Sequence, residues 1–289
     1  MFSGFLDTVA VVSKLTRVCK RVSRIGHDAS KTLDLHNKPV TEKQLATLLQ
    51  RFHHVEALDL SFCRKLHSSV GAPGPPLQLC VKTLQDLSLR GVGVDDTTLS
   101  YVGRLTQLRR LDVSQSQLDA SEKVTDAGIL ALSGLRELTY LSVAWNKNVT
   151  DEAVAAAVGS MPRLAFLDAS LCQLVGGETT TALVAQCPAL EELLVEACPK
   201  MDRVCLSPLA AEGQEGCGGR RGGAAKLRSL KLRHCERVTS AALTVLCDVP
   251  SLRVSFFAAF PIIECRFAIW KWNFLTAILC RPAFLVLNA

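Results

Sequence analysis

Twelve cysteines and six histidines are the side chains of this sequence with the greatest capacity for chemistry. Depending on their spacing, thiols and imidazoles bind metals, form disulfides or serve as nucleophile and base. The chain contains no Cys-x-x-Cys pair, and no two histidines have the spacing of zinc ligands. None of the histidines has a nucleophile and a carboxylate beside it at an informative spacing. We therefore predict neither a metal site nor a catalytic residue.

Two glycine-rich stretches lack what nucleotide binding requires. Residues 213–223 have no Gly-Lys-Ser/Thr ending of a phosphate-binding loop. The Gly-Val-Gly sequence at residues 91–93 is not followed by the third glycine of a dinucleotide-binding turn. The sequence therefore predicts a protein that is not an enzyme and that needs no cofactor.

The overall composition is that of an ordered globular protein, with 48% hydrophobic and 21% charged residues. A net charge of +6 over 289 residues is modest, so we expect no nucleic-acid partner. The first 17 residues have no basic start before their apolar part, which Asp7 interrupts, so they do not match a secretory signal. We expect a cytoplasmic protein, or a nuclear one, with reduced thiols.

A repeated frame, Leu-x-x-Leu-x-Leu-x-x-Cys, organises most of the chain. One copy runs from Val55 to Cys63, and an earlier copy around Leu33 lacks only its first leucine. The copies start at residues 55, 84, 108, 138, 164, 190, 227 and 252, in steps of 24 to 37 residues. This frame and this spacing are typical of leucine-rich repeats.

Each repeat predicts a strand, a turn and a helix. The Leu-x-Leu triplet alternates buried and outward side chains, as a short strand does. Val-Thr-Asp at residues 124–126 and 149–151 supplies helix N-caps, and Thr41 with Gln44 has the spacing of a capping box. Stacked repeats of this kind form an α/β solenoid, or horseshoe, with parallel strands on the concave face and helices on the convex face.

The ninth position of the frame is a cysteine in four repeats and an asparagine in one. Asparagine at this position hydrogen-bonds the backbone of the neighbouring coil. A buried thiol can fill the same place as a small apolar group with a weak donor. We therefore predict a structural role for these side chains, and no redox or catalytic one. They are Cys63, Cys172, Cys198, Cys235 and Asn146.

Residues 124–130 and 149–154 resemble the cysteine-containing subtype of leucine-rich repeat, which is common in F-box proteins and their relatives. The resemblance covers residues 29–253. A glycine-rich, charged insertion near residues 210–225 is expected to be an exposed loop. The resemblance implies a repeat domain that binds other proteins.

Residues 1–28 resemble the second half of an F-box, which in that family contacts the Skp-type adaptor of a cullin ubiquitin ligase. The opening helix of the motif is absent, and Val22 replaces the usual aromatic residue, so we expect this contact to be weakened or lost. The alternative is an amphipathic cap over the edge of the first repeat. The residues that match the adaptor-binding segment are Phe5, Leu6, Leu15, Val18 and Cys19.

The last segment, residues 254–289, does not follow the frame. It holds six of the eleven phenylalanines and two of the three tryptophans. Charged residues such as Glu264 and Lys271 interrupt it, so no run reaches the roughly 18 apolar residues of a membrane span. The segment is a hydrophobic cap, a membrane segment that spans the bilayer or lies at its interface, or a tail from an altered reading frame or a retained intron. The sequence leaves these alternatives open.

The outward positions of the strands predict a partner-binding surface. Neighbouring strands lie about 4.8 Å apart, so aromatic residues in consecutive repeats are expected to form one exposed patch beside arginines. Such residues are enriched in interface hot spots. The alternative is that the tryptophan and phenylalanine of this set only cover loop edges. The predicted partner-binding residues are Arg90, Arg109, Arg110, Tyr140, Trp145 and Phe166.

These features together predict a protein-binding leucine-rich-repeat protein. The favoured function is the substrate-recognition subunit of an SCF-type cullin ubiquitin ligase, acting in ubiquitin-dependent protein degradation. A protein substrate is expected on the concave face, and residues 1–28 are expected to dock the adaptor and, through it, the cullin. The alternative is a leucine-rich-repeat scaffold or regulator with no ligase connection, associated with a membrane through its C-terminus in one variant of this hypothesis.

Overall fold

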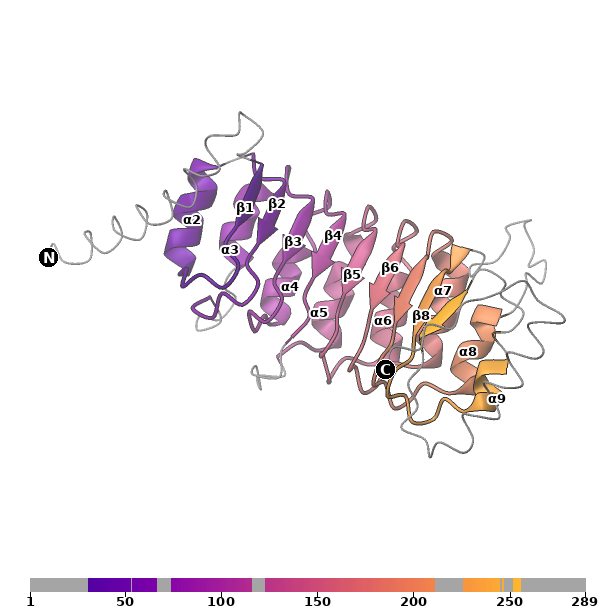
Figure 1. Ribbon diagram of the computed structural model, residues 1–289. Helices are drawn as coiled ribbons and strands as arrows, with labels where there is room; N and C mark the ends of the chain where they lie inside the picture. Colours follow the sequence, from indigo (N-terminus) through magenta and orange to yellow (C-terminus); the bar gives the residue numbers. More distant parts are fainter. Residues whose placement is uncertain are drawn as a thin grey trace, which may run out of the picture.

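The repeats stack into one continuous sheet backed by helices (Figure 1). The computed structural model describes residues 31–52, 54–66, 74–115, 123–210, 226–244, 246 and 252–255. Within these ranges the sheet has nine strands, and their order in space is their order in the sequence. Every pairing is parallel. Each connection therefore crosses the back of the sheet, where the helices lie.

All nine described strands are three residues long, one for each copy of the frame. They are β1 (Thr32–Asp34), β2 (Ala57–Asp59), β3 (Asp86–Ser88), β4 (Arg110–Asp112), β5 (Tyr140–Ser142), β6 (Phe166–Asp168), β7 (Glu192–Leu194), β8 (Ser229–Lys231) and β9 (Arg253–Ser255). The helices of the described residues follow the strands in alternation. They are α2 (Glu42–Arg51), α3 (Gly74–Leu77), η2 (Gln78–Cys80), α4 (Asp96–Val102), α5 (Asp126–Leu130), η3 (Ala131–Gly134), α6 (Asp151–Val158), α7 (Gly177–Gln186), α8 (Arg203–Ala210) and α9 (Ser240–Leu243).

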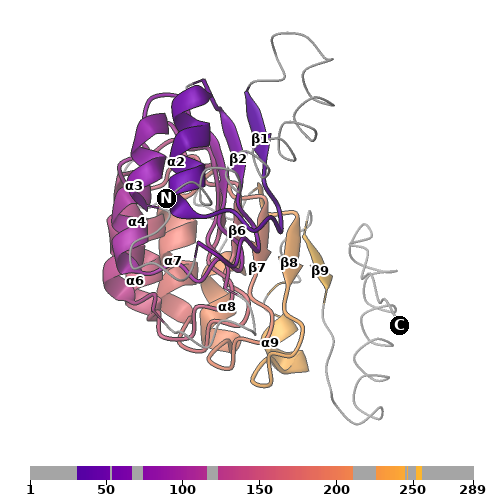
Figure 2. The same ribbon diagram turned by 90° about the vertical axis from the view of Figure 1, so that its left-hand side faces the viewer.

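The register of the sheet follows the repeated frame. Leu58 pairs with Leu87, Leu87 with Leu111 and Leu111 with Leu141. The middle residues of the strands therefore form a ladder on the face of the sheet that packs against the helices. Figure 2 shows the resulting two layers, with the helices on one side and the strands on the other. The predicted α/β solenoid, with strands and helices on opposite faces, is confirmed.

The core is a single apolar layer between the sheet and the helices. Leucines of the frame are almost completely buried, and Leu108, Leu111 and Leu141 are at most 1% exposed. Burying a leucine side chain contributes about 1.5–3 kcal/mol. Because each repeat buries leucines at the same positions, every coil adds a similar amount to the free energy of unfolding. This stabilisation depends on packing against the neighbouring coils.

Threonine side chains begin three of the helices at the predicted residues. Thr41 accepts a hydrogen bond from the Gln44 N–H, and the Gln44 side chain accepts one from the Thr41 N–H, which completes a capping box. Thr125 and Thr150 cap α5 and α6 through their hydroxyl oxygens, which accept from the N–H groups of Ala127 and Ala153. The N-caps predicted from the sequence are confirmed.

Three aspartates in the first turns of α4, α5 and α6 each bond to the helix start of the next repeat. The Asp96 carboxylate accepts from the N–H and the hydroxyl of Thr125, at 2.8 and 2.6 Å. Asp126 accepts the same two bonds from Thr150, at 2.8 and 2.9 Å. Asp151 then accepts from the N–H and hydroxyl of Thr179, at 3.0 and 2.7 Å. This ladder couples the N-termini of α4 to α7 across three repeat interfaces.

In most repeats, the turn after the strand contains a residue in a left-handed backbone conformation. This residue comes two places after the last apolar residue of the Leu-x-Leu triplet. Its φ is positive, and its N–H donates to a carbonyl of the next repeat. Ala197, for example, has a φ of 52° and donates to the Arg233 carbonyl at 2.6 Å. The residues in this position with positive φ are Asn37, Phe62, Gly91, Trp145, Leu171, Ala197 and His234.

We expect Ala197→Gly to raise the free energy of unfolding by about 0.5–1 kcal/mol, because glycine adopts positive φ without the steric cost that a Cβ carries. Urea denaturation measures the difference. Ala156→Gly, at an exposed site inside α6, is the control and should lower stability by about 1 kcal/mol. Equal losses in both variants would contradict the assignment of strain to this turn.

The boundaries predicted for the repeat domain are only partly within the described residues. The strand β9 crosses the boundary that we placed after residue 253. The segment 1–28, most of the insertion near residues 210–225 and residues 256–289 lie outside the described ranges. In the part of the chain that the structure describes, helices are too short or too polar to cross a bilayer.

Candidate functional site

A three-layer stack stands on the concave face of the sheet. The Tyr140 and Phe166 rings are parallel, with centroids 4.3 Å apart and an interplanar angle of 7°. The Arg110 Cζ lies 4.3 Å from the Tyr140 ring centroid. These residues occupy the first position of β4, β5 and β6, which pair in register. The frame therefore places a cation and two aromatic rings in neighbouring strands, where they form one continuous wall.

The other predicted partner-binding residues surround this stack without joining it. Arg109 directly precedes β4, and its carbonyl accepts bonds from the N–H groups of Thr139 and Tyr140. Trp145 lies in the turn beyond β5, is half-buried and has a φ of 67°. Arg90 lies in the turn after β3. Of the six predicted residues, the structure thus brings Arg110, Tyr140 and Phe166 into direct contact.

Phe62 is an aromatic residue of the concave rim that the sequence prediction missed. The Arg90 Cζ lies 5.9 Å from its ring centroid, and the ring of His36 meets it edge-on at 5.6 Å. The ring lies over Gly91, where a Cβ would come within 2.6 Å of it. Phe62 occupies the same turn position as Trp145, so the frame itself contained the signal that could have identified it.

Aspartates form a row across the sheet, at the third position of the strands. The Asp59 carboxylate accepts from the Ser61 N–H at 2.8 Å, and Asp112 accepts from the Ser114 N–H at 2.9 Å. Asp168 accepts from the Ser170 N–H at 3.0 Å. Each carboxylate thus stabilises the turn that follows its own strand, which explains its recurrence in the frame.

Burial perturbs the groups in the middle of this face. It raises the pKa of the Asp112 carboxyl, although hydrogen bonds from Ser114 and the charge of Arg90 lower that pKa in part. Burial also raises the pKa of the Tyr140 hydroxyl, and the carboxylates of Asp112 and Asp168 raise it further. The charges of Arg110 and Arg90 lower this pKa in part.

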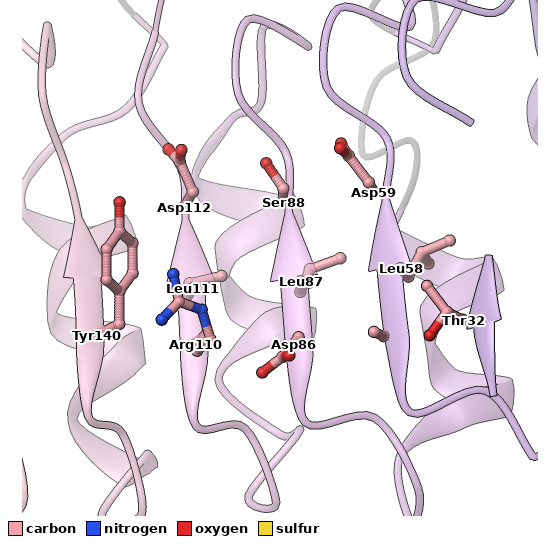
Figure 3. A pocket seen from close by; sticks show the side chains of 11 residues that line it. Thr32, Leu58, Asp59, Asp86, Leu87, Ser88, Arg110, Leu111, Asp112 and Tyr140 are labelled. Atoms are coloured by element: carbon pink, nitrogen blue, oxygen red, sulfur yellow. The ribbon is translucent and has the colours of Figure 1, made fainter. Parts of the chain in front are cut away.

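A shallow hollow of about 210 Å³ opens in the sheet beside the stack (Figure 3). Thr32, Ala57 and Ser88 contribute short side chains to it, and Arg110 and Tyr140 stand at one end. Figure 3 shows the Asp59, Ser88 and Asp112 side chains and the Tyr140 hydroxyl on one side of the hollow, and Asp86 with Arg110 on the other. The hollow can accommodate one side chain of a partner.

The ninth-position side chains donate to the preceding coil, as the sequence predicts. Cys63 Sγ lies 3.0 Å from the Leu35 carbonyl oxygen, and Cys172 Sγ lies 3.3 Å from that of Val143. Asn146 Nδ2 donates to the Val113 carbonyl of the preceding coil at 3.4 Å and to the Val143 carbonyl of its own coil at 2.7 Å. The structural role predicted for this position is confirmed in these repeats.

Burial makes these thiols poor nucleophiles. It raises the pKa of Cys172 to about 12, and it raises that of Cys198 as well. A thiol must lose its proton to attack a substrate or bind a metal, so neither group is prepared for such chemistry. Within the described ranges, histidine, cysteine and acidic side chains do not gather in a group of three that could hold a metal ion.

The residues predicted to bind an adaptor lie outside the described part of the chain, so their placement stays a prediction. They are Phe5, Leu6, Leu15, Val18 and Cys19.

No protein-family model matches the chain, and no curated protein matches its sequence. Solved structures resemble it weakly. A chain of the Rad7 and Elc1 complex in yeast is 14% identical, with 78% of this chain and 75% of that chain covered and a TM-score of 0.38. An internalin (InlF) from Listeria monocytogenes is 17% identical, with coverages of 75% and 71% and a TM-score of 0.40. At such identities the likeness concerns the fold alone.

Proposed function

We propose that this leucine-rich-repeat protein is the substrate-recognition subunit of an SCF-type cullin ubiquitin ligase. The observation that carries the protein-binding part is the Arg110–Tyr140–Phe166 stack on the concave face of the sheet. Tyrosine, tryptophan and arginine dominate the binding energy of protein interfaces. Stacking of the two rings on each other restricts their rotamers before binding, and this restriction lowers the entropic cost of association.

The ligase part of the proposal rests on the F-box-like residues 1–28 and on the cysteine-containing repeat subtype. In this arrangement, residues 1–28 dock a Skp-type adaptor, and the solenoid holds a protein substrate against its concave face. The chain itself catalyses nothing and acts by positioning the substrate. The proposal places the protein in the cytosol or the nucleus, where such complexes act.

Co-purification with a Skp-type adaptor tests the ligase part. The full chain and a version lacking residues 1–28 are each expressed together with the adaptor. On this proposal the full chain captures the adaptor, more weakly than a chain with a complete F-box does, and the shortened version does not capture it. Failure of the full chain to capture the adaptor would contradict the ligase proposal and leave a leucine-rich-repeat scaffold.

We expect Tyr140→Ala and Arg110→Ala to reduce the recovery of ubiquitin-modified proteins with the chain about tenfold or more, because a central hot spot contributes about 2 kcal/mol or more. Recovery is measured from cells with the proteasome inhibited, and adaptor capture should not change. The convex helix α4 offers a matched control, since Arg104 Cζ lies 5.6 Å from the Tyr101 ring there. Equal losses from Tyr101→Ala and Arg104→Ala would show that the concave stack is not the site.

A further inference from the structure

The hollow on the concave face is a product of unequal side chains in neighbouring strands. Thr32, Ala57 and Asp86 share the first strand position of β1, β2 and β3, and all are shorter than the arginine and tyrosine that follow in β4 and β5. The concave surface is therefore lower over β1 to β3 than over β4 and β5. The backbone at the middle position forms its floor, because the side chains of Leu58 and Leu87 point into the core and are 2% exposed.

Three carboxylates line this hollow, from Asp59, Asp86 and Asp112. Asp59 and Asp112 each accept a hydrogen bond from their own turn, whereas the Asp86 side chain accepts none from the residues that the structure describes. In the described part of the chain, the ion pairs join other residues and leave all three carboxylates without a cationic partner within 4.0 Å. The hollow thus holds more negative charge than the protein neutralises.

Two arginines reduce this excess but do not remove it. The Arg110 guanidinium is stacked on Tyr140, and Arg90 is drawn toward the Phe62 ring in the turn. Counting both, two positive charges stand against three carboxylates at the hollow and a fourth, Asp168, beside it. Burial of Asp112 strengthens its interaction with any charge that enters, because water screens buried charges less.

We infer that the concave face recognises a protein segment with a basic side chain, which enters this hollow between Asp59, Asp86 and Asp112. The backbone of the segment lies across β2 to β5, and its neighbouring residues contact the edge of the Tyr140–Phe166 stack. This inference deepens the proposed function, because it names the chemistry of the substrate. It does not depend on the adaptor, so the two can fail separately.

The net charge of the whole chain makes this inference testable with simple peptides. A protein of net charge +6 has no general attraction for a cationic peptide, so binding must come from a local site. The probes are fluorescein-labelled Gly-Ser-Arg-Arg-Ser-Gly, the same peptide with two citrullines in place of arginine, and the same peptide with two glutamates. Citrulline keeps the shape of arginine and removes its charge. Fluorescence polarisation with the full chain gives the dissociation constants.

We expect the arginine peptide to bind at least tenfold more tightly than the citrulline and glutamate peptides. Asp86→Asn should weaken it about fivefold, which corresponds to one partly exposed charge pair. Asp86 is the best position for this variant because its carboxylate stabilises no turn. Ala57→Trp should abolish binding, because the indole fills the hollow. Circular dichroism and thermal melting check that both variants are folded.

Convex-face variants of α6 are matched controls for charge and for bulk. Glu152→Gln removes an exposed carboxylate, and Ala156→Trp adds an exposed indole, so both should bind the arginine peptide like the wild type. Tighter binding of the glutamate peptide would overturn the inference, as would equal weakening by Asp86→Asn and Glu152→Gln. Absence of any peptide binding at millimolar concentration would overturn it too, even if the adaptor were captured.

Discussion

Asp151→Ala is expected to lower the free energy of unfolding by about 3 kcal/mol. Asp151 is 8% exposed, and its carboxylate accepts from the Glu178 N–H at 2.7 Å and from the N–H and hydroxyl of Thr179. Hydrogen bonds to a charged group contribute about 1.5–3 kcal/mol, and their loss leaves buried donors without a partner. Urea denaturation followed by circular dichroism measures the change.

Glu152→Ala is the matched control, because Glu152 is the exposed neighbour of Asp151 in the first turn of the same helix, α6. It loses only a favourable interaction with the helix dipole, so the cost should stay below about 1 kcal/mol. Repeats are coupled only to their neighbours. Asp151→Ala is therefore also expected to split the unfolding curve into two transitions, one for the N-terminal and one for the C-terminal repeats. Equal costs for the two variants would contradict the role of the aspartate ladder.

Asn146→Asp is expected to be the more damaging of two substitutions at the ninth position. Asn146 is 3% exposed, and its Nδ2 donates to the carbonyls of Val143 and Val113. A carboxylate cannot donate, so the variant places a buried negative charge against carbonyl oxygens. We expect a loss of about 3–5 kcal/mol at pH 7, as for other unpaired buried charges. Thermal and urea denaturation give the value.

The control at this position is Asn146→Cys, which copies the side chain found in other repeats. The Cys172 thiol already donates to the Val143 carbonyl, so a thiol at residue 146 can donate to Val113 and should cost about 1 kcal/mol or less. The two variants separate the need for a donor from the need for an amide. A large loss in Asn146→Cys would contradict this account.

Acid should rescue the aspartate variant. Burial raises the pKa of the new carboxyl in the folded state above its unfolded value of about 4. Below that unfolded value the group is protonated in both states and can donate, so the stability deficit is smallest there. The deficit grows as the pH rises through the folded pKa. Comparing the variant with wild type at pH 4 and pH 7 tests the sign.

Much of the fold follows from local sequence, because one short pattern recurs in each coil. The leucines of the frame specify both the strand and its buried face, since a shift by one residue would expose the whole ladder. The helix starts at Thr125 and Thr150 were predictable because capping depends on residues within one turn. The sequence did not predict where β9 ends, because the frame is incomplete in the last repeat.

The candidate site was predictable only in part. Arg110, Tyr140 and Phe166 share one position of the frame in consecutive repeats, so their proximity followed from strand order alone. Trp145 belongs to a different position, and the left-handed turn carries it beyond the end of β5. Its position relative to the stack depends on the path of the turn.

By itself, the sequence determined the repeat, its parallel strands, its capped helices and the structural role of the ninth-position cysteines. Each of these features depends on the spacing of residues within about 30 positions, which is the length of one repeat. The tertiary structure alone decided that Asp151 is shared between two repeats and that Phe62 covers Gly91. It also decided that short side chains beside the stack leave a hollow lined by carboxylates. These features involve side chains of different coils. Whether such side chains touch depends on their lengths and rotamers and on how the coils stack.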